Sequence, residues 1–296
     1  MTFQWSVPKC LISLLFLILA GCTSMPETIT LTGTGATFPV ETILAASSGR
    51  PVSFDALIED LAGVRVIYVG ETHTSREHHI IQARLIEALH ARHADLTVGM
   101  EMFDHRYDPV LEAWRTGGLD RAAFIEKTHW YVPRSGWGFP FDLYAPVFEA
   151  IQSRRIPLVG LNVPGWIPPK ISAAGIANLL PDERALIAEH IDTSHAEHRA
   201  YVQSIYNETT AHRRFGSFDE FYEAQCAWED TMAASIARKL GEGPMVVVIG
   251  NGHIQYKYGV PDRAYDRTQA PFRTVYLAAA GTQVDLAVAD YIWVTP

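Results

Sequence analysis

Two apolar runs decide the fold: Val66-Ile67-Tyr68-Val69-Gly70-Glu71-Thr72-His73 and Leu96-Thr97-Val98-Gly99-Met100-Glu101-Met102. Each run is short, rich in apolar or β-branched residues and bounded by polar residues, which predicts a buried strand. Between them, Ile81, Leu85, Ala88 and Leu89 recur at helical spacing. A strand–helix–strand unit of this kind indicates a parallel sheet.

Charged and imidazole side chains follow these strands. Glu71, His73 and Glu101 end the two runs, and a later run, Met245-Val246-Val247-Val248-Ile249, is closed by Gly250-Asn251-Gly252-His253. Because parallel sheets bind ligands at the carboxyl ends of their strands, we expect Glu71, His73, Glu101 and His253 to share one edge. His73 would face a helix N-terminus, which favours neutral imidazole, the form that binds metals or accepts a proton.

Composition and the N-terminal residues limit the classes of protein to which the chain can belong. With 48% hydrophobic and 19% charged residues the chain can build a core, and its net charge of −9 argues against a nucleic-acid partner. Residues 1–21 resemble a signal peptide, with Lys9 before a short apolar segment. The segment ends Leu19-Ala20-Gly21-Cys22, which resembles a bacterial lipobox. We therefore expect a lipidated Cys22, and Thr23 after it favours the outer membrane.

The mature chain is expected to hold one domain. Residues 22–50, rich in Thr, Gly and Ser, suggest a flexible tether from the lipid, and residues 51–296 suggest a single α/β domain. Helical patterns fill residues 168–240, an expected helical insertion. Residues 273–279 and 283–288 read as strands joined at Gly281-Thr282, which favours a hairpin. The predicted fold is a mostly parallel central sheet with helices on both faces and an antiparallel C-terminal edge.

Three aromatic or His-rich segments are candidates for ligand binding. Residues 129–144 carry six Trp, Tyr or Phe side chains among Gly and Pro, and either wall a flat apolar ligand or pack onto the core. Phe221, Trp228 and Met232 belong to a stripe that predicts core packing. A more polar helix before it is either a solvated face or part of a haem or metal site; its candidate residues are His195, His198, Tyr201, Tyr206 and His212.

Several motifs together resemble the ChaN-like haem-binding lipoproteins, which belong to a wider grouping with Tiki, TraB and the erythromycin esterases. The resemblance spans about residues 54–279. The motifs that carry it are Gly70-Glu71-Thr72-His73, His78-His79, Val98-Gly99-Met100-Glu101-Met102-Phe103, Trp137-Gly138, Gly160-Leu161-Asn162, Gln225-Cys226-Ala227-Trp228-Glu229 and Gly250-Asn251-Gly252-His253.

The resemblance implies an outer-membrane lipoprotein that binds haem during haem or iron acquisition, with a haem or iron receptor as a partner. It also implies a homodimer that holds two haems face to face, with a Tyr on the iron and a His at the propionates. No motif places that Tyr in this chain. Local chemistry favours Tyr201 and Tyr206, because phenolate ligates ferric haem iron.

The wider grouping implies an alternative, a periplasmic metal-dependent hydrolase that uses Glu71, His73, Glu101 and His253. Two His and two carboxylates suit a divalent metal that activates water, and His73 or Glu71 could instead act as a general base without metal. The same four residues could also form a polar network that only stabilises the loop ends. We expect a haem binder that is not an enzyme, with the hydrolase as the alternative.

Overall fold

The computed structural model describes residues 27–133, 135–208 and 217–296. Within these ranges, no helix is both long enough and apolar enough to cross a membrane. Cys22 and His212, the expected lipidation site and one expected haem residue, lie outside the described residues.

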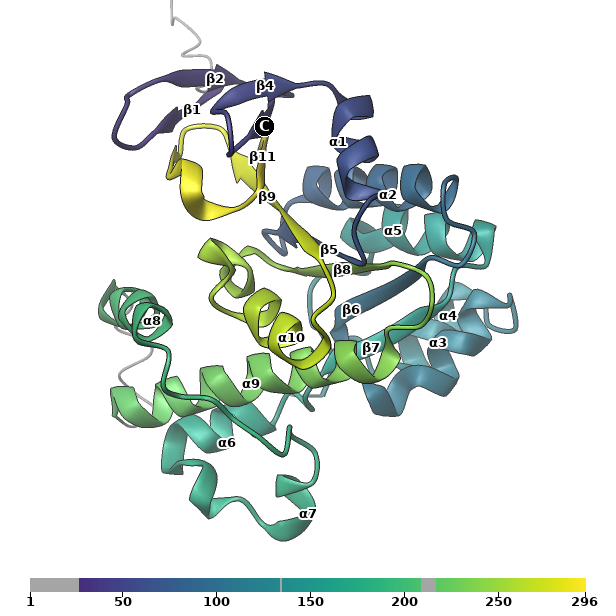
Figure 1. The fold of residues 1–296 in the computed structure, drawn as a ribbon. Helices are drawn as coiled ribbons and strands as arrows, with labels where there is room; N and C mark the ends of the chain where they lie inside the picture. Colours follow the sequence, from purple (N-terminus) through teal and green to yellow (C-terminus); the bar gives the residue numbers. More distant parts are fainter. Residues whose placement is uncertain (1–26, 134, 209–216) are drawn as a thin grey trace, which may run out of the picture.

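An eight-stranded sheet forms the centre of the molecule (Figure 1). Six of its strands, from β11 to β7, run parallel, and two short strands continue the sheet antiparallel at one edge. In spatial order the strands are β4 (Arg50–Val52), β3 (Ile43–Ala45), β11 (Tyr291–Thr295), β9 (Phe272–Ala279), β5 (Val66–Glu71), β8 (Met245–Gly250), β6 (Thr97–Asp104) and β7 (Leu158–Asn162). The predicted α/β class with a mostly parallel sheet is confirmed.

Helices cover both faces of this sheet, which explains why its central strands are apolar on both sides. Ile67, Val69 and Val246 pack on one face against α1 (Phe54–Leu61), α2 (Arg76–His90), α3 (Asp108–Arg115), α4 (Arg121–Lys127) and α5 (Phe141–Arg154). Tyr68 and Val247 pack on the other face against α9 (Phe218–Lys239) and α10 (Val260–Thr268). All six residues of β5 and of β8 are buried.

The expected helical insertion lies between β7 and β8. Its described helices are α6 (Ile167–Ala174), α7 (Pro181–Arg184), α8 (Ala196–Glu208) and the long α9. In Figure 1, α6, α7 and α8 project from the sheet on the side of α9. This places the insertion beside the carboxyl ends of the strands, where it can wall a site.

The expected C-terminal hairpin is wrong. After β9, the chain turns at Gly281, whose φ of 85° suits glycine, and β10 (Gln283–Val284) pairs with β1 (Thr28–Leu31) instead. The last strand, β11, then returns parallel to β9. The antiparallel edge beside β11 is made by the N-terminal strands β3 and β4.

Four short strands lie within residues 28–52, so the flexible tether expected for residues 22–50 is wrong from Thr28 onward. β1 joins β10 and β2 (Thr37–Pro39) in a small second sheet. Ile29 and Leu31 are buried and pack on Ile292 and Val294 of the main sheet. Their alternation with threonines is a period-two strand pattern, which the Thr- and Gly-rich composition obscured.

Candidate functional site

The ends of three neighbouring strands bring the four expected residues together. Glu71 ends β5, Glu101 lies in β6, and His253 follows β8, which runs between those two strands. His73 reaches the same place: a Cβ atom at Gly250 would lie 2.8 Å from His73 Cε1 and 3.4 Å from Glu101 Oε2. Glycine at this strand end therefore allows His73 and Glu101 to approach the backbone of β8.

Glu71 is a buried carboxylate whose two oxygens are both occupied. Oε1 lies 2.8 Å from His73 Nδ1 and accepts a hydrogen bond of 2.7 Å from the Tyr144 hydroxyl. Oε2 accepts a hydrogen bond of 2.9 Å from the Gln82 amide. Burial raises the pKa of Glu71, but the hydrogen bonds and charges of His73 and His79 outweigh it and hold the pKa at about 2. Glu71 is thus an orienting anion and not a base near neutral pH.

His73 keeps its Nε2 directed away from Glu71. The side chain is 31% exposed, and its ring packs edge-on against Trp137 at a centroid distance of 4.7 Å. Burial lowers the pKa of His73, yet the hydrogen bond to Glu71 and the charge of Glu101 raise it above the ordinary value. The sequence favoured a neutral imidazole through the helix N-terminus. The two carboxylates act in the opposite direction and raise the pKa of His73.

His253 lies between two buried carboxylates. Its Nε2 is 3.4 Å from Glu101 Oε1 and its Nδ1 is 3.1 Å from Glu229 Oε1. Burial would lower the pKa of His253, but Glu101 and Glu229 raise it to about 10. His253 is therefore an imidazolium at neutral pH. Glu229 belongs to this arrangement and was not predicted as a site residue, although the Gln225–Glu229 motif contains it.

The expected divalent-metal site gains no support. Among the described residues, no three His, Cys, Asp or Glu side chains are arranged to hold a metal ion. Glu71 is hydrogen-bonded to His73 Nδ1, and both ring nitrogens of His253 face carboxylates. Glu71 and His73 form a hydrogen-bonded pair, and Glu101 and His253 form an ion pair at 3.4 Å.

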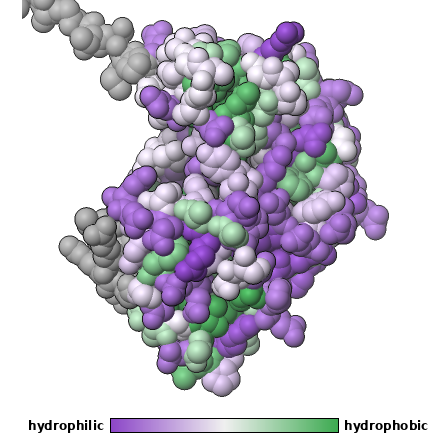
Figure 2. Space-filling model, turned by 60° about the vertical axis from the view of Figure 1, so that its left-hand side comes forward, coloured by the Kyte–Doolittle hydropathy of each residue, from purple (hydrophilic) through white to green (hydrophobic). Residues whose placement is uncertain are grey.

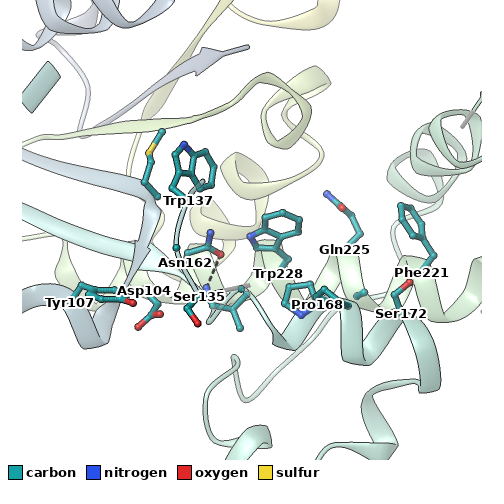
Figure 3. Close-up of a pocket in the computed structure, with 16 residues that line it drawn as sticks. Asp104, Tyr107, Ser135, Trp137, Asn162, Pro168, Ser172, Phe221, Gln225 and Trp228 are labelled. Atoms are coloured by element: carbon teal, nitrogen blue, oxygen red, sulfur yellow. Dashed lines mark hydrogen bonds between the residues drawn. The ribbon is translucent and has the colours of Figure 1, made fainter. Parts of the chain in front are cut away.

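An aromatic cavity of about 400 Å³ lies next to these pairs (Figure 3). Trp137 and Trp228 line it, and each also contacts a histidine of the pairs: Trp137 packs on His73, and Trp228 on His253 at 4.9 Å between ring centroids. In Figure 3, Trp228 lies between Trp137 and Gln225, with Phe221 farther along α9. The polar side chains among its lining residues are those of Asp104, Tyr107, Ser135, Asn162, Ser172 and Gln225.

The sequence left open whether the aromatic loop, residues 129–144, walls a ligand or packs onto the core. The structure shows that different side chains of the loop do each. Trp130, Phe141 and Tyr144 are buried in the core, whereas Trp137 walls the cavity and donates its indole N–H to the Tyr144 hydroxyl at 2.8 Å. The stripe on α9 divides likewise. Met232 is core, and Phe221 and Trp228 line the cavity, where the sequence predicted packing alone.

Tyr107 is the one tyrosine among the cavity-lining residues, all of which lie in the described part of the chain. Its hydroxyl is 3.4 Å from His129 Nδ1. Burial and the charge of Asp104 raise its pKa. Asp104 is held by two hydrogen bonds of 2.8 Å from Arg106, whose side chain is 45% exposed. No sequence pattern distinguished Tyr107, since it lies outside the periodic helices.

The expected haem residues on α8, and His195 just before it, do not line this cavity. His198 is buried, 3.0 Å from Glu229 and 3.2 Å from the Tyr222 hydroxyl, so it is engaged in the core. His195 accepts a hydrogen bond from the His198 backbone N–H. Tyr201 packs against Tyr256, and Tyr206 against Phe218 and Phe221.

Comparison with known proteins identifies the family. A family model described as haem-binding uptake, Tiki superfamily, ChaN matches residues 57–264. The chain belongs to the ChaN family. A solved structure described as cofacial haem binding to ChaN of Campylobacter jejuni is 18% identical, with a TM-score of 0.69, and the match covers 85% of this chain and 95% of that one. This likeness confirms the fold.

A mutant erythromycin esterase, EreC in its open conformation, is also similar to this ChaN-family chain. It is 12% identical with a TM-score of 0.48, and the match covers 81% of this chain and 76% of that one. No curated protein matches the chain.

Proposed function

We propose that the chain is an outer-membrane lipoprotein, anchored through Cys22, that binds haem in the aromatic cavity during haem or iron acquisition. Its membership of the haem-binding ChaN family supports the ligand. The observation that carries the proposal is the cavity of about 400 Å³ walled by Trp137 and Trp228. Sites of this size with aromatic walls and a few polar groups are typical of small-molecule binding.

The residues present fit haem. The indoles of Trp137 and Trp228 offer flat apolar faces for a macrocycle. Tyr107 can supply a phenolate to ferric iron, with His129 at hydrogen-bond distance to accept the phenol proton. The guanidinium of Arg106 is 45% exposed beside Asp104 of the cavity wall, and its positive charge can attract a propionate. We therefore favour Tyr107 over Tyr201 and Tyr206 as the iron ligand.

A haemin titration of the chain beginning at Thr23 tests both the function and the ligand. The wild type should give a saturable Soret band with a high-spin, tyrosine-type spectrum. Tyr107→Phe should lose the phenolate signature and weaken binding roughly tenfold or more, while Tyr201→Phe and Tyr206→Phe should bind as the wild type does. If haemin does not bind, the function is wrong. If Tyr201→Phe loses the signature and Tyr107→Phe keeps it, the ligand assignment is wrong.

Haem-driven pairing of two protomers belongs to the same proposal, because the family resemblance implies haem held between two copies. The mass in solution should double when haemin is added. A monomer that stays monomeric at saturating haemin would restrict the proposal to one haem in one chain. A haem or iron receptor is the expected partner in acquisition.

A second candidate function is hydrolysis with His73 as a metal-free general base. The pair Glu71–His73 favours it, because a buried carboxylate fixes Nδ1 and leaves Nε2 free to take a proton from water. Ester substrates offered to the purified chain test this candidate. Hydrolysis should vanish in His73→Ala and persist in His93→Ala, whose imidazole lies 3.0 Å from the Ala62 carbonyl. Activity that survives His73→Ala would rule it out.

A further inference from the structure

The small N-terminal sheet lies close to the proposed lipid anchor. Six residue steps separate Cys22 from Thr28, the first residue of β1. A fully extended chain of that length spans at most about 20 Å. If Cys22 is lipidated, as proposed above, this sheet is held at the membrane surface and cannot move far from it.

The same sheet is fixed to the rest of the molecule. Ile29 and Leu31 of β1 pack in one buried cluster with Leu44, Ile292 and Val294. The three-stranded sheet therefore cannot swing independently of the main sheet. Whatever orientation it takes on a membrane is imposed on the whole described fold.

The part of this sheet from β1 to β2 has no charged side chain, and Asp285, next to β10, stands at its border. Residues 28–40 contain no Asp, Glu, Lys or Arg, although 19% of the chain is charged. Residues 32–37, the turn from β1 into β2, are all exposed. Figure 2 shows this upper end of the molecule largely in white and green, whereas purple predominates lower down. The nearest charged side chains along the chain, Glu27 and Glu41, stand at its borders.

We infer that the face made by residues 28–40 rests against the lipid headgroups of the membrane that holds Cys22. Bacterial membranes carry anionic lipids, and a chain with net charge −9 is repelled by them. Turning the uncharged face toward the bilayer keeps the carboxylates away from that surface. No apolar side chain needs to insert, because the covalent lipid supplies the anchoring energy.

This orientation has a consequence for the cavity. In Figure 1 the small sheet is at one end of the molecule, and α6 and α9, which line the cavity, are toward the other. The cavity is then held away from the lipid, where a ligand or partner in the aqueous compartment can reach it.

Spin labelling of the full-length lipoprotein in vesicles of phosphatidylethanolamine and phosphatidylglycerol tests the inference. Thr34→Cys places a nitroxide in the exposed turn, and Leu180→Cys places one beside α7, where Leu180 is 56% exposed. Cys226 is fully buried and will not react with the label. A water-soluble nickel chelate should relax the label at position 34 several-fold less in vesicles than in the unlipidated chain beginning at Thr23. The label at 180 should be relaxed equally in both.

A matched variant separates orientation from anchoring. About 20 Gly/Ser residues inserted between Cys22 and Thr28 should restore access to the label at 34, because the longer chain no longer holds the sheet at the surface. Flotation with vesicles and the acyl mass on Cys22 report lipidation independently. An unlipidated protein would overturn both anchoring and orientation. A lipidated protein whose label at 34 is as accessible as in the soluble chain would overturn the orientation alone.

Discussion

His253 holds two buried carboxylates in place through one side chain. Glu101 faces Nε2 and Glu229 faces Nδ1, and both carboxylates are almost fully buried. Without the imidazolium, Glu229 would keep His198 and Arg263 as partners, and Glu101 would keep the Gly250 N–H, but each buried carboxylate would lose its contact with His253. The residue thus joins β6, α9 and the end of β8 by electrostatics at the point where the two tryptophans meet the cavity.

Replacing His253 by alanine should destabilise the fold by about 3–5 kcal/mol, the range for removing one partner of a buried ion pair. Chemical denaturation of wild type and variant measures it. His93→Ala is a matched control: it loses a contact to one carbonyl and should cost only about 0.5–1.5 kcal/mol. Equal, small losses in the two variants would show that Glu101 and Glu229 do not need the imidazolium.

The pH dependence of stability follows from the same pairs. His253 has a pKa raised to about 10 in the fold, so its contribution is complete below its unfolded value near 6.5 and is lost as pH rises toward 10. Glu71 has a pKa lowered to about 2, so its contribution is complete above its unfolded value near 4.3 and is lost as pH falls toward 2. The free energy of unfolding should be highest between about pH 5 and 6.5.

Denaturant titrations across pH 3–10 test this, with His253→Gln as the comparison. The alkaline decline should be much weaker in His253→Gln, because no imidazolium remains to titrate, while the acid decline should persist. An alkaline limb of unchanged size in the variant would contradict the assignment to His253.

The residues of the site were predictable where a motif followed a strand. Glu71, His73, Glu101 and His253 each follow an apolar run, so the parallel-sheet rule placed them at one edge. Glu229 and Tyr107 could not be predicted as site residues from the sequence, and the physical reasons differ. Glu229 comes to the site only because α9 packs against the sheet. The orientation of Tyr107 depends on a short turn after β6.

At the scale of elements, the end of β8 is closely packed against the histidine pair. Gly250→Ala would place a methyl group 2.8 Å from His73 Cε1, with Glu101 Oε2 also near. His73 is held by Glu71 and Trp137 and cannot move away freely. We expect a loss of about 1–3 kcal/mol in the free energy of unfolding.

Gly252→Ala is the control for that strand end, because a Cβ there meets no atom within 4 Å. Its stability should stay within about 0.5 kcal/mol of the wild type. Both values come from urea unfolding monitored by circular dichroism. A neutral Gly250→Ala would mean that His73 relaxes without cost.

The length of an apolar run determined whether a strand could be predicted from the sequence. The runs ending at Glu71 and Gly250 are long, buried on both faces and recognisable as central strands. β1, β2 and β10 have two to four residues each. Such strands exist only through pairing with segments distant in sequence, which a local pattern does not contain.

At the scale of the whole molecule, the N-terminal strands complete the fold. β3 covers the outer edge of β11, and Ile29, Leu31, Ile43 and Leu44 are buried. A chain beginning at Ser53 loses all four side chains. At about 1.5–3 kcal/mol for each buried aliphatic side chain, the loss matches the entire stability of a typical domain.

We expect a chain beginning at Glu27 to fold and a chain beginning at Ser53 to aggregate or remain unfolded, because the truncation also exposes an unpaired strand edge. Solubility and thermal unfolding of the two purified chains measure this. Two chains of equal stability would restore the interpretation of residues 28–50 as a tether.

Trp137 and Trp228 line the cavity and also contact His73 and His253, so their fluorescence can report what the cavity holds. An indole within contact distance of a bound porphyrin transfers its excitation energy to the macrocycle, so emission from Trp137 and Trp228 should fall as the cavity fills. Replacing one indole at a time by phenylalanine would assign the quenching to each wall. Filling of the cavity could then be followed on the purified protein without any added dye.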